Sequence, residues 1–159
     1  VAHQNKKRWT VNDELRMLRG PRNWGKQIRL FVAGDFTMIG YTTVGTKDIA
    51  KAGAFYDKLF EALGAKRLMV MDRFIMWGTD FSRPGFAIAL PYDGKDATVG
   101  NGVMVALAVN SREKVDEIHK LALELGGSDE GAPGARAPQF YAGYFRDLDG
   151  NKLNAFFMG

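Results

Sequence analysis

Apolar residues recur at spacings of three and four along two stretches of the chain, which predicts two amphipathic helices. The first helix covers residues 47–63, and seven apolar positions form its face: Ile49, Ala52, Phe55, Tyr56, Leu59, Phe60 and Leu63. The second begins at Ser111, a residue type that caps helices, and its face has four apolar positions: Val115, Ile118, Ala122 and Leu125. Gly64 and Gly126 follow the two faces and are placed to end the helices.

Short β-rich runs flank both helices and predict strands. In the first half they cover residues 41–46, 67–71, 74–78 and 86–90, and in the second half 103–109, 141–146 and 153–157. The Gly/Pro-rich stretch 131–138 is predicted to be a loop. Alternation along 103–109 predicts that Val103, Val105, Leu107 and Val109 face the helix and that Met104, Ala106 and Ala108 face away from it.

The strand–helix unit occurs twice, at a constant separation of 63 residues. Tyr41 falls on Met104, Phe55 on Ile118, and Gly64 on Gly127. A repeated unit of this kind implies two copies of one supersecondary structure that share a core. We therefore predict an α+β domain over residues 38–159, with module one at 38–92 and module two at 101–159.

Residues 1–37 differ from this domain in charge. They hold eight Lys or Arg and three acidic residues, a net charge of +5, whereas the whole chain carries +4. We predict a basic N-terminal extension with a short helix after Thr10 and a possible strand at 28–32. Its origin stays open between a genuine appendage, a translated upstream region and non-native sequence. Because the excess charge is confined to it, nucleic-acid binding by the main domain is not expected.

Composition narrows the compartment and the chemistry. The absence of Cys excludes disulfides, thiolate catalysis and Cys-ligated metals, and it fits a cytoplasmic protein. No apolar run approaches the roughly 20 residues of a membrane span, and the N-terminus lacks the apolar stretch of a secretory signal. We expect a cytoplasmic protein without membrane contact.

Three segments together resemble the glyoxalase/bleomycin resistance/dioxygenase family, also called the vicinal oxygen chelate superfamily. They are MIGYTTVGTKDIAKAGAFYDKLFEALGAKR, GNGVMVALAVNSREKVDEIHKLALELGG and FRDLDGNKLNAFF. The resemblance covers about residues 38–159. It implies two βαβββ modules whose curved mixed sheets enclose a small-molecule cavity, and a homodimer.

The resemblance also implies where a metal would be bound. In metal-dependent members, His, Gln or Glu ligands come from the first strand and a late strand of each module. Here Tyr41 and Met104 stand at the first-strand positions, and Asn154 and the neighbourhood of Ile88 at the late-strand positions. Met is soft, Ile is inert, Asn is neutral, and a Tyr phenol must lose a proton with a pKa near 10. We therefore expect no metal and no cofactor.

The strands carry the candidate ligand-binding residues. They are expected to line the cavity and to favour an apolar or aromatic ligand: Tyr41, Phe74, Met76, Phe86, Met104, Tyr144, Asn154 and Phe156. Tyr41 is the one candidate catalytic residue, as a proton donor, although a pocket-lining aromatic is the plainer interpretation. Asn154 is expected to bond to a neighbouring side chain such as Tyr41.

Three further polar features receive structural interpretations. His119 is predicted on the helix surface or at an interface, and Arg73 in a solvated turn. The stretch from Asp147 to Asn151 has too few oxygen ligands for a calcium loop and is predicted to be a plain turn.

Three functions compete at this point. The first is a metal-free protein of the resistance type, which sequesters an apolar or aromatic small molecule in the cavity between its modules or between subunits. The second is a glyoxalase-type lyase or isomerase that works through Tyr41 or with a metal bound elsewhere. The third is an interaction module that binds a partner or nucleic acid through residues 1–37.

Overall fold

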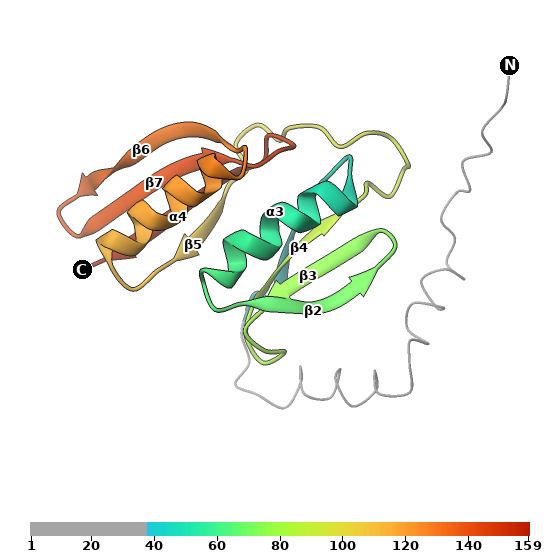
Figure 1. Cartoon of the computed structure of the whole chain (residues 1–159), viewed down its shortest axis with the longest axis horizontal. Helices are drawn as coiled ribbons and strands as arrows, with labels where there is room; N and C mark the ends of the chain where they lie inside the picture. The colour runs from blue at the N-terminus through green and yellow to red at the C-terminus, as the bar shows by residue number, and fades with distance from the viewer. Residues whose placement is uncertain (1–37) are drawn as a thin grey trace, which may run out of the picture.

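The computed structural model describes residues 38–159, which fold as two similar halves (Figure 1). The first half contains β1 (Tyr41–Gly45), α3 (Ile49–Glu61), β2 (Lys66–Met71), β3 (Phe74–Gly78) and β4 (Gly85–Ala89). The second contains β5 (Val105–Ala108), α4 (Arg112–Glu124), β6 (Ser128–Ala137), β7 (Phe140–Arg146) and β8 (Lys152–Met158). The helix and strand predicted within residues 1–37 lie outside the described residues.

Each half forms a four-stranded mixed sheet with the same strand order. The order is β1-β4-β3-β2 in the first sheet and β5-β8-β7-β6 in the second. In each sheet the strand before the helix runs parallel to the last strand, and the other pairs are antiparallel. The predicted α+β fold of two βαβββ modules is confirmed, and among residues 38–159 the strands form two open sheets, not a closed barrel.

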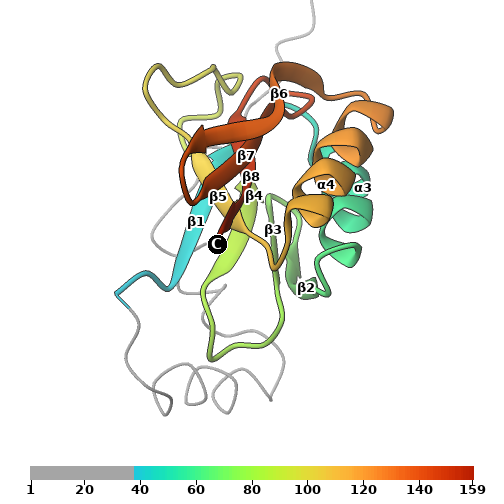
Figure 2. The same cartoon turned by 90° about the vertical axis from the view of Figure 1, so that its left-hand side faces the viewer.

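Both helices lie on the same side of the sheets, next to one another (Figure 2). Asp48 caps α3 by accepting hydrogen bonds from the backbone of Ala50 and Lys51, and Ser111 caps α4 through Lys114 N. The apolar face predicted for each helix is buried in one core that both modules share. Neither of the helices within residues 38–159 lies on the opposite side of the sheets.

The core of module one is built around Tyr56 of α3. Its ring lies 5.2 Å from that of Phe60, 5.7 Å from that of Trp77 and 4.7 Å from that of Phe86, measured between centroids. Tyr56 is fully buried, so its hydroxyl needs a partner inside the protein. That partner belongs to the other module: the hydroxyl donates to Asp147 Oδ2 at 2.7 Å.

The turn between β7 and β8 adds further bonds across the two modules. Asp149 accepts hydrogen bonds from Thr46 Oγ1 at 2.6 Å and from Lys47 N at 3.0 Å. Asn151 Nδ2 donates to Gly45 O at 2.9 Å. These bonds, with that between Tyr56 and Asp147, form the inter-module clasp. The stretch predicted to be a plain turn is a turn, but it also joins the second module to the end of β1.

One prediction in module two is wrong, and another is confirmed only in part. Residues 131–138 were expected to form a loop, yet most of them belong to β6, whose pairing with β7 is interrupted by three register shifts. Glycines suit such bulges; Gly131, for instance, has a φ of 150°. The strand expected at 103–109 is shorter, and Val103 is 62% exposed. Continuing the register would pair Val103 with Asn151, whose side chain is engaged in the clasp.

The placement predicted for His119 is also wrong. Its side chain is buried, at 6% relative exposure of the residue, with Nε2 2.9 Å from Asp129 Oδ1 and 3.2 Å from Tyr144 O. Asp129 belongs to β6, a strand that the sequence did not predict. Because β6 is present, the helix position of His119 is interior and not at the surface. Gly143 makes room for the imidazole, since a Cβ there would lie 3.2 Å from His119 Cδ2.

None of the helices described between residues 38 and 159 has the length and apolar composition needed to cross a membrane.

Replacing Tyr56 with Phe tests the clasp. The substitution keeps the ring but removes a donor from the buried Asp147 carboxylate, so we expect the free energy of unfolding to fall by about 2–3 kcal/mol. Urea denaturation of the full chain measures it. The matched control is Tyr141→Phe, because Tyr141 also donates to a carboxylate, that of Asp116, but at the surface. Equal losses in the two variants would contradict the importance assigned to the buried bond.

Candidate functional site

The side of the sheets without helices brings together most of the predicted site residues. Side chains along β3 and β4 point alternately to the two sides of the sheet. On the helix side, the core beneath α3 contains Ile75, Trp77, Phe86 and Ile88, and the residues between them face the other way. We call this other side the helix-free face. On module one it carries three of the predicted residues: Tyr41, Phe74 and Met76.

The helix-free face of module one is apolar and partly covered by its own aromatic rings. Tyr41 and Phe74 meet edge to face with their centroids 6.0 Å apart. Met76 and Ala87, which are paired on adjacent strands, are both buried. Tyr41 itself is 53% exposed. Its hydroxyl makes no hydrogen bond to another residue of the range 38–159.

In module two, Asn154 occupies the middle of the same face. On β8 it pairs with Ala106 of β5 and with Tyr144 of β7. It is only 1% exposed, and its Oδ1 accepts no hydrogen bond in the described part of the chain. The expected bond to Tyr41 is therefore wrong. A buried amide oxygen without a donor is uncommon and calls for an explanation.

Aromatic and cationic side chains surround Asn154 on this face. Phe156, two residues further along β8, has its ring centroid 5.6 Å from that of Phe140. The ring of Tyr144 has Lys152 Nζ at 5.5 Å and the guanidinium carbon of Arg136 at 5.4 Å from its centroid. Tyr144 is thus an aromatic surface with positive charge beside it.

Glu130 balances part of this positive charge. It receives two hydrogen bonds from Arg146, at 2.8 and 2.6 Å, and forms an ion pair with Lys152 at 3.6 Å. These bonds from Arg146 lower the pKa of the Glu130 carboxyl. Sequence reasoning missed this group, although Lys152 stands two residues before Asn154 and so shares its face.

Two predicted site residues are placed differently from the rest. Phe86 lies on the helix side, packed in the core against Tyr56 and Phe60 with centroid distances of 4.7 and 5.0 Å. Strand alternation separates it from Met76 and Tyr41. Met104 precedes the first residue of β5 and is exposed.

The sheet register locates the fourth of the positions that the family resemblance implies for a metal ligand. Thr43 and Ala106 are equivalent by the 63-residue repeat; Thr43 pairs with Ala87, and Ala106 pairs with Asn154. Ala87 therefore corresponds to Asn154, whereas Ile88, the position first considered, faces the core.

The residues at these four positions do not fit a metal site. An alanine methyl offers no donor atom, a thioether and a neutral amide are weak ligands for hard cations, and the phenol would have to ionise. Within the described residues no group of three or more His, Asp or Glu is placed to hold a metal ion.

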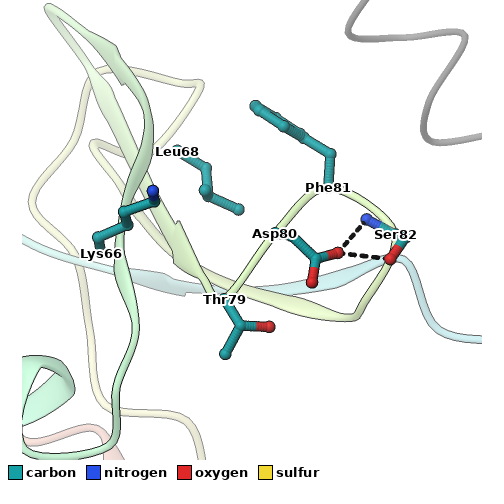
Figure 3. A pocket seen from close by; sticks show the side chains of 6 residues that line it. All are labelled: Lys66, Leu68, Thr79, Asp80, Phe81 and Ser82. Atoms are coloured by element: carbon teal, nitrogen blue, oxygen red, sulfur yellow. Dashed lines mark hydrogen bonds between the residues drawn. The ribbon is translucent and has the colours of Figure 1, made fainter.

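A separate hollow lies at the turn between β3 and β4, where Asp80 and Ser82 face one another (Figure 3). Asp80 accepts hydrogen bonds from the hydroxyl of Ser82 and from its backbone N–H, and these bonds lower the pKa of the Asp80 carboxyl. A carboxylate with a lowered pKa is a poor base for activating a hydroxyl. The pair therefore stabilises a turn. Arg73, predicted to be solvated, donates to Pro91 O at 2.8 Å and stabilises a nearby loop.

Comparison with known proteins agrees with this architecture. The sequence model of the Glyoxalase/Bleomycin resistance protein/Dioxygenase superfamily matches residues 38–155. A crystal structure of a glyoxalase/bleomycin resistance protein from Albidiferax ferrireducens is 32% identical, with a TM-score of 0.69 over 76% of this chain and 98% of that one. No curated protein matches the chain.

More distant structures share the fold alone. A putative glyoxalase from Bacillus halodurans is 21% identical, with a TM-score of 0.63 over 75% of this chain and 94% of that one. A lactoylglutathione lyase from Agrobacterium tumefaciens is 19% identical, with a TM-score of 0.57 over 76% and 93% of the two chains. The chain therefore belongs to the glyoxalase/bleomycin resistance protein/dioxygenase superfamily.

Glu130 provides a test of the electrostatics of the helix-free face. A carboxyl whose native pKa is lowered stabilises the fold above its unfolded pKa, about 4.3, and this contribution is lost as the pH falls through the native value. We expect Glu130→Gln to lower stability at neutral pH and to flatten its acid dependence. Urea denaturation at a series of pH values measures both effects.

Arg146→Gln should have the same effect, since it removes the main cause of the shift. If the acid dependence of the double variant differed from that of both single variants, the assignment to this pair would fail.

Proposed function

We propose that this protein binds a planar, largely apolar small molecule on the helix-free face, and that the molecule donates a hydrogen bond to Asn154. The observation that carries the proposal is the buried Oδ1 of Asn154, which lacks a donor among the described residues. Because Asn154 is covered in this structure, the ligand reaches the oxygen by displacing neighbouring side chains of the face. It stands at one of the four positions that the family resemblance implies for metal ligands in metal-dependent members.

Energetics favour a ligand as the missing partner. A buried acceptor without a donor costs about 1–3 kcal/mol, whereas a hydrogen bond from a ligand recovers this cost on binding. A site built on an unpaired polar group also discriminates, because an analogue without the donor leaves the group unpaired.

The surroundings of Asn154 support an aromatic or flat apolar ligand. Tyr144 lies on the neighbouring strand, and Phe156 and Phe140 form a ring pair further along the face. Small side chains at Ala106 and Ala108, both exposed, leave space beside them. Aromatic side chains with one placed polar group are the usual composition of small-molecule sites.

Replacing Asn154 with Leu separates binding from a purely structural role. Leu has a similar volume and no polar atom, so we expect stability to rise by about 1 kcal/mol, since the unpaired oxygen is removed. Indole, which carries an N–H, should bind the parent about tenfold more tightly than N-methylindole, and the variant should bind both equally. Thermal denaturation and calorimetric titration measure the two effects.

Asn101→Leu, the same change at an exposed position, is the control and should alter neither result. A large loss of stability in Asn154→Leu, or a parent that does not discriminate between the two indoles, would contradict the proposal.

Metal content discriminates between this proposal and the enzyme alternative. Because Tyr41, Ala87, Met104 and Asn154 offer no adequate donor set, we expect elemental analysis of the purified chain to find nickel, zinc, iron, manganese and cobalt well below one equivalent. One equivalent retained through dialysis would favour a glyoxalase-type lyase or isomerase with a metal bound elsewhere.

A further inference from the structure

A second cavity lies between the two modules, away from the helix-free face of module one. Its volume is about 550 Å³, within the range of roughly 300–1,000 Å³ usual for small-molecule sites. One wall comes from the end of α3 and the sheet of module one, including Phe60, Trp77 and Phe86. The other wall is β5, from Val105 to Ala108. We call this cavity the seam groove.

The strand arrangement explains why the groove exists. β1 and β5 are both edge strands, each paired on one side only within its own sheet. The clasp joins the modules at Gly45 and Thr46, where β1 ends. The groove is lined by Thr42, near the start of the same strand. The modules are thus fastened at one end of their contact and separated at the other.

The lining combines an apolar interior with one cation. Arg83 is the only charged residue that the described part of the chain contributes to it. Its side chain is 75% exposed, and its ion pair with Asp80 is long, at 3.9 Å. Asp80 is meanwhile bonded to Ser82, so the guanidinium keeps donors for another anion.

We propose that the seam groove binds a monocarboxylic acid with an apolar body, such as a medium-chain fatty acid. The apolar body lies between the module-one wall of the groove and β5, and the carboxylate pairs with Arg83. Because the two walls belong to different modules, the occupant stabilises their contact. The groove shares β5 with the surface beside Asn154, so the two proposals are distinguished by Asn154→Leu and Arg83→Gln, each of which should affect only its own ligand.

Calorimetric titration of the full chain with decanoate and with decanol tests the charge requirement. Decanoate should bind more tightly at low ionic strength, and the difference should shrink as salt screens the ion pair. Arg83→Gln should weaken decanoate binding about fivefold, as expected for an exposed ion pair, and leave decanol unaffected. Lys95→Gln removes an equal charge from a residue outside the groove lining and should change neither affinity.

A second variant tests the location. Thr42→Phe places a strand-compatible aromatic ring inside the groove and should abolish binding of both decanoate and decanol, while thermal denaturation shows that the variant is folded. No binding of decanoate by the parent, unchanged binding by Thr42→Phe, or equal effects of Arg83→Gln and Lys95→Gln would overturn the proposal.

Discussion

The buried carboxylate of Asp147 holds the two modules in one arrangement. Burying a charge is costly unless several donors satisfy it. Asp147 receives four: the Tyr56 hydroxyl, the Asn151 amide, and the backbone N–H groups of Asp149 and Asn151. Burial, and then the charge of Asp147, raise the pKa of the Tyr56 phenol, so it stays a donor throughout the neutral range.

Both surfaces proposed to bind ligands depend on this arrangement. The clasp fixes the end of β1 against the turn of module two, and the unfastened remainder of the contact leaves the seam groove. It also orients the two sheets so that their helices lie together on one side. Tyr56 links this contact to the aromatic core of module one. Its ring packs within module one, whereas its hydroxyl donates a hydrogen bond to module two.

Membership of the superfamily settles the fold but not the function. Folds of this kind host many chemistries, and function depends on the residues of the site. At the positions where metal-dependent relatives place ligands, this chain has a phenol, a methyl group, a thioether and an amide. The amide is the informative one, since an oxygen buried without a donor is costly unless something binds to it.

The sequence by itself determined the repeat, both helices with their buried faces, most strands and the family, because these depend on local periodicity and spacing. It also predicted that Tyr41, Met76 and Asn154 belong to strands, as they do. Only the tertiary structure decided that Phe86 lies in the core, that Ala87 and not Ile88 corresponds to Asn154, and that His119 is buried beneath β6. A shift of one residue moves a strand side chain to the other face, and register is fixed by pairing with distant strands. The clasp was hidden for the same reason, because its partners are separated by about a hundred positions and meet only once both modules have folded.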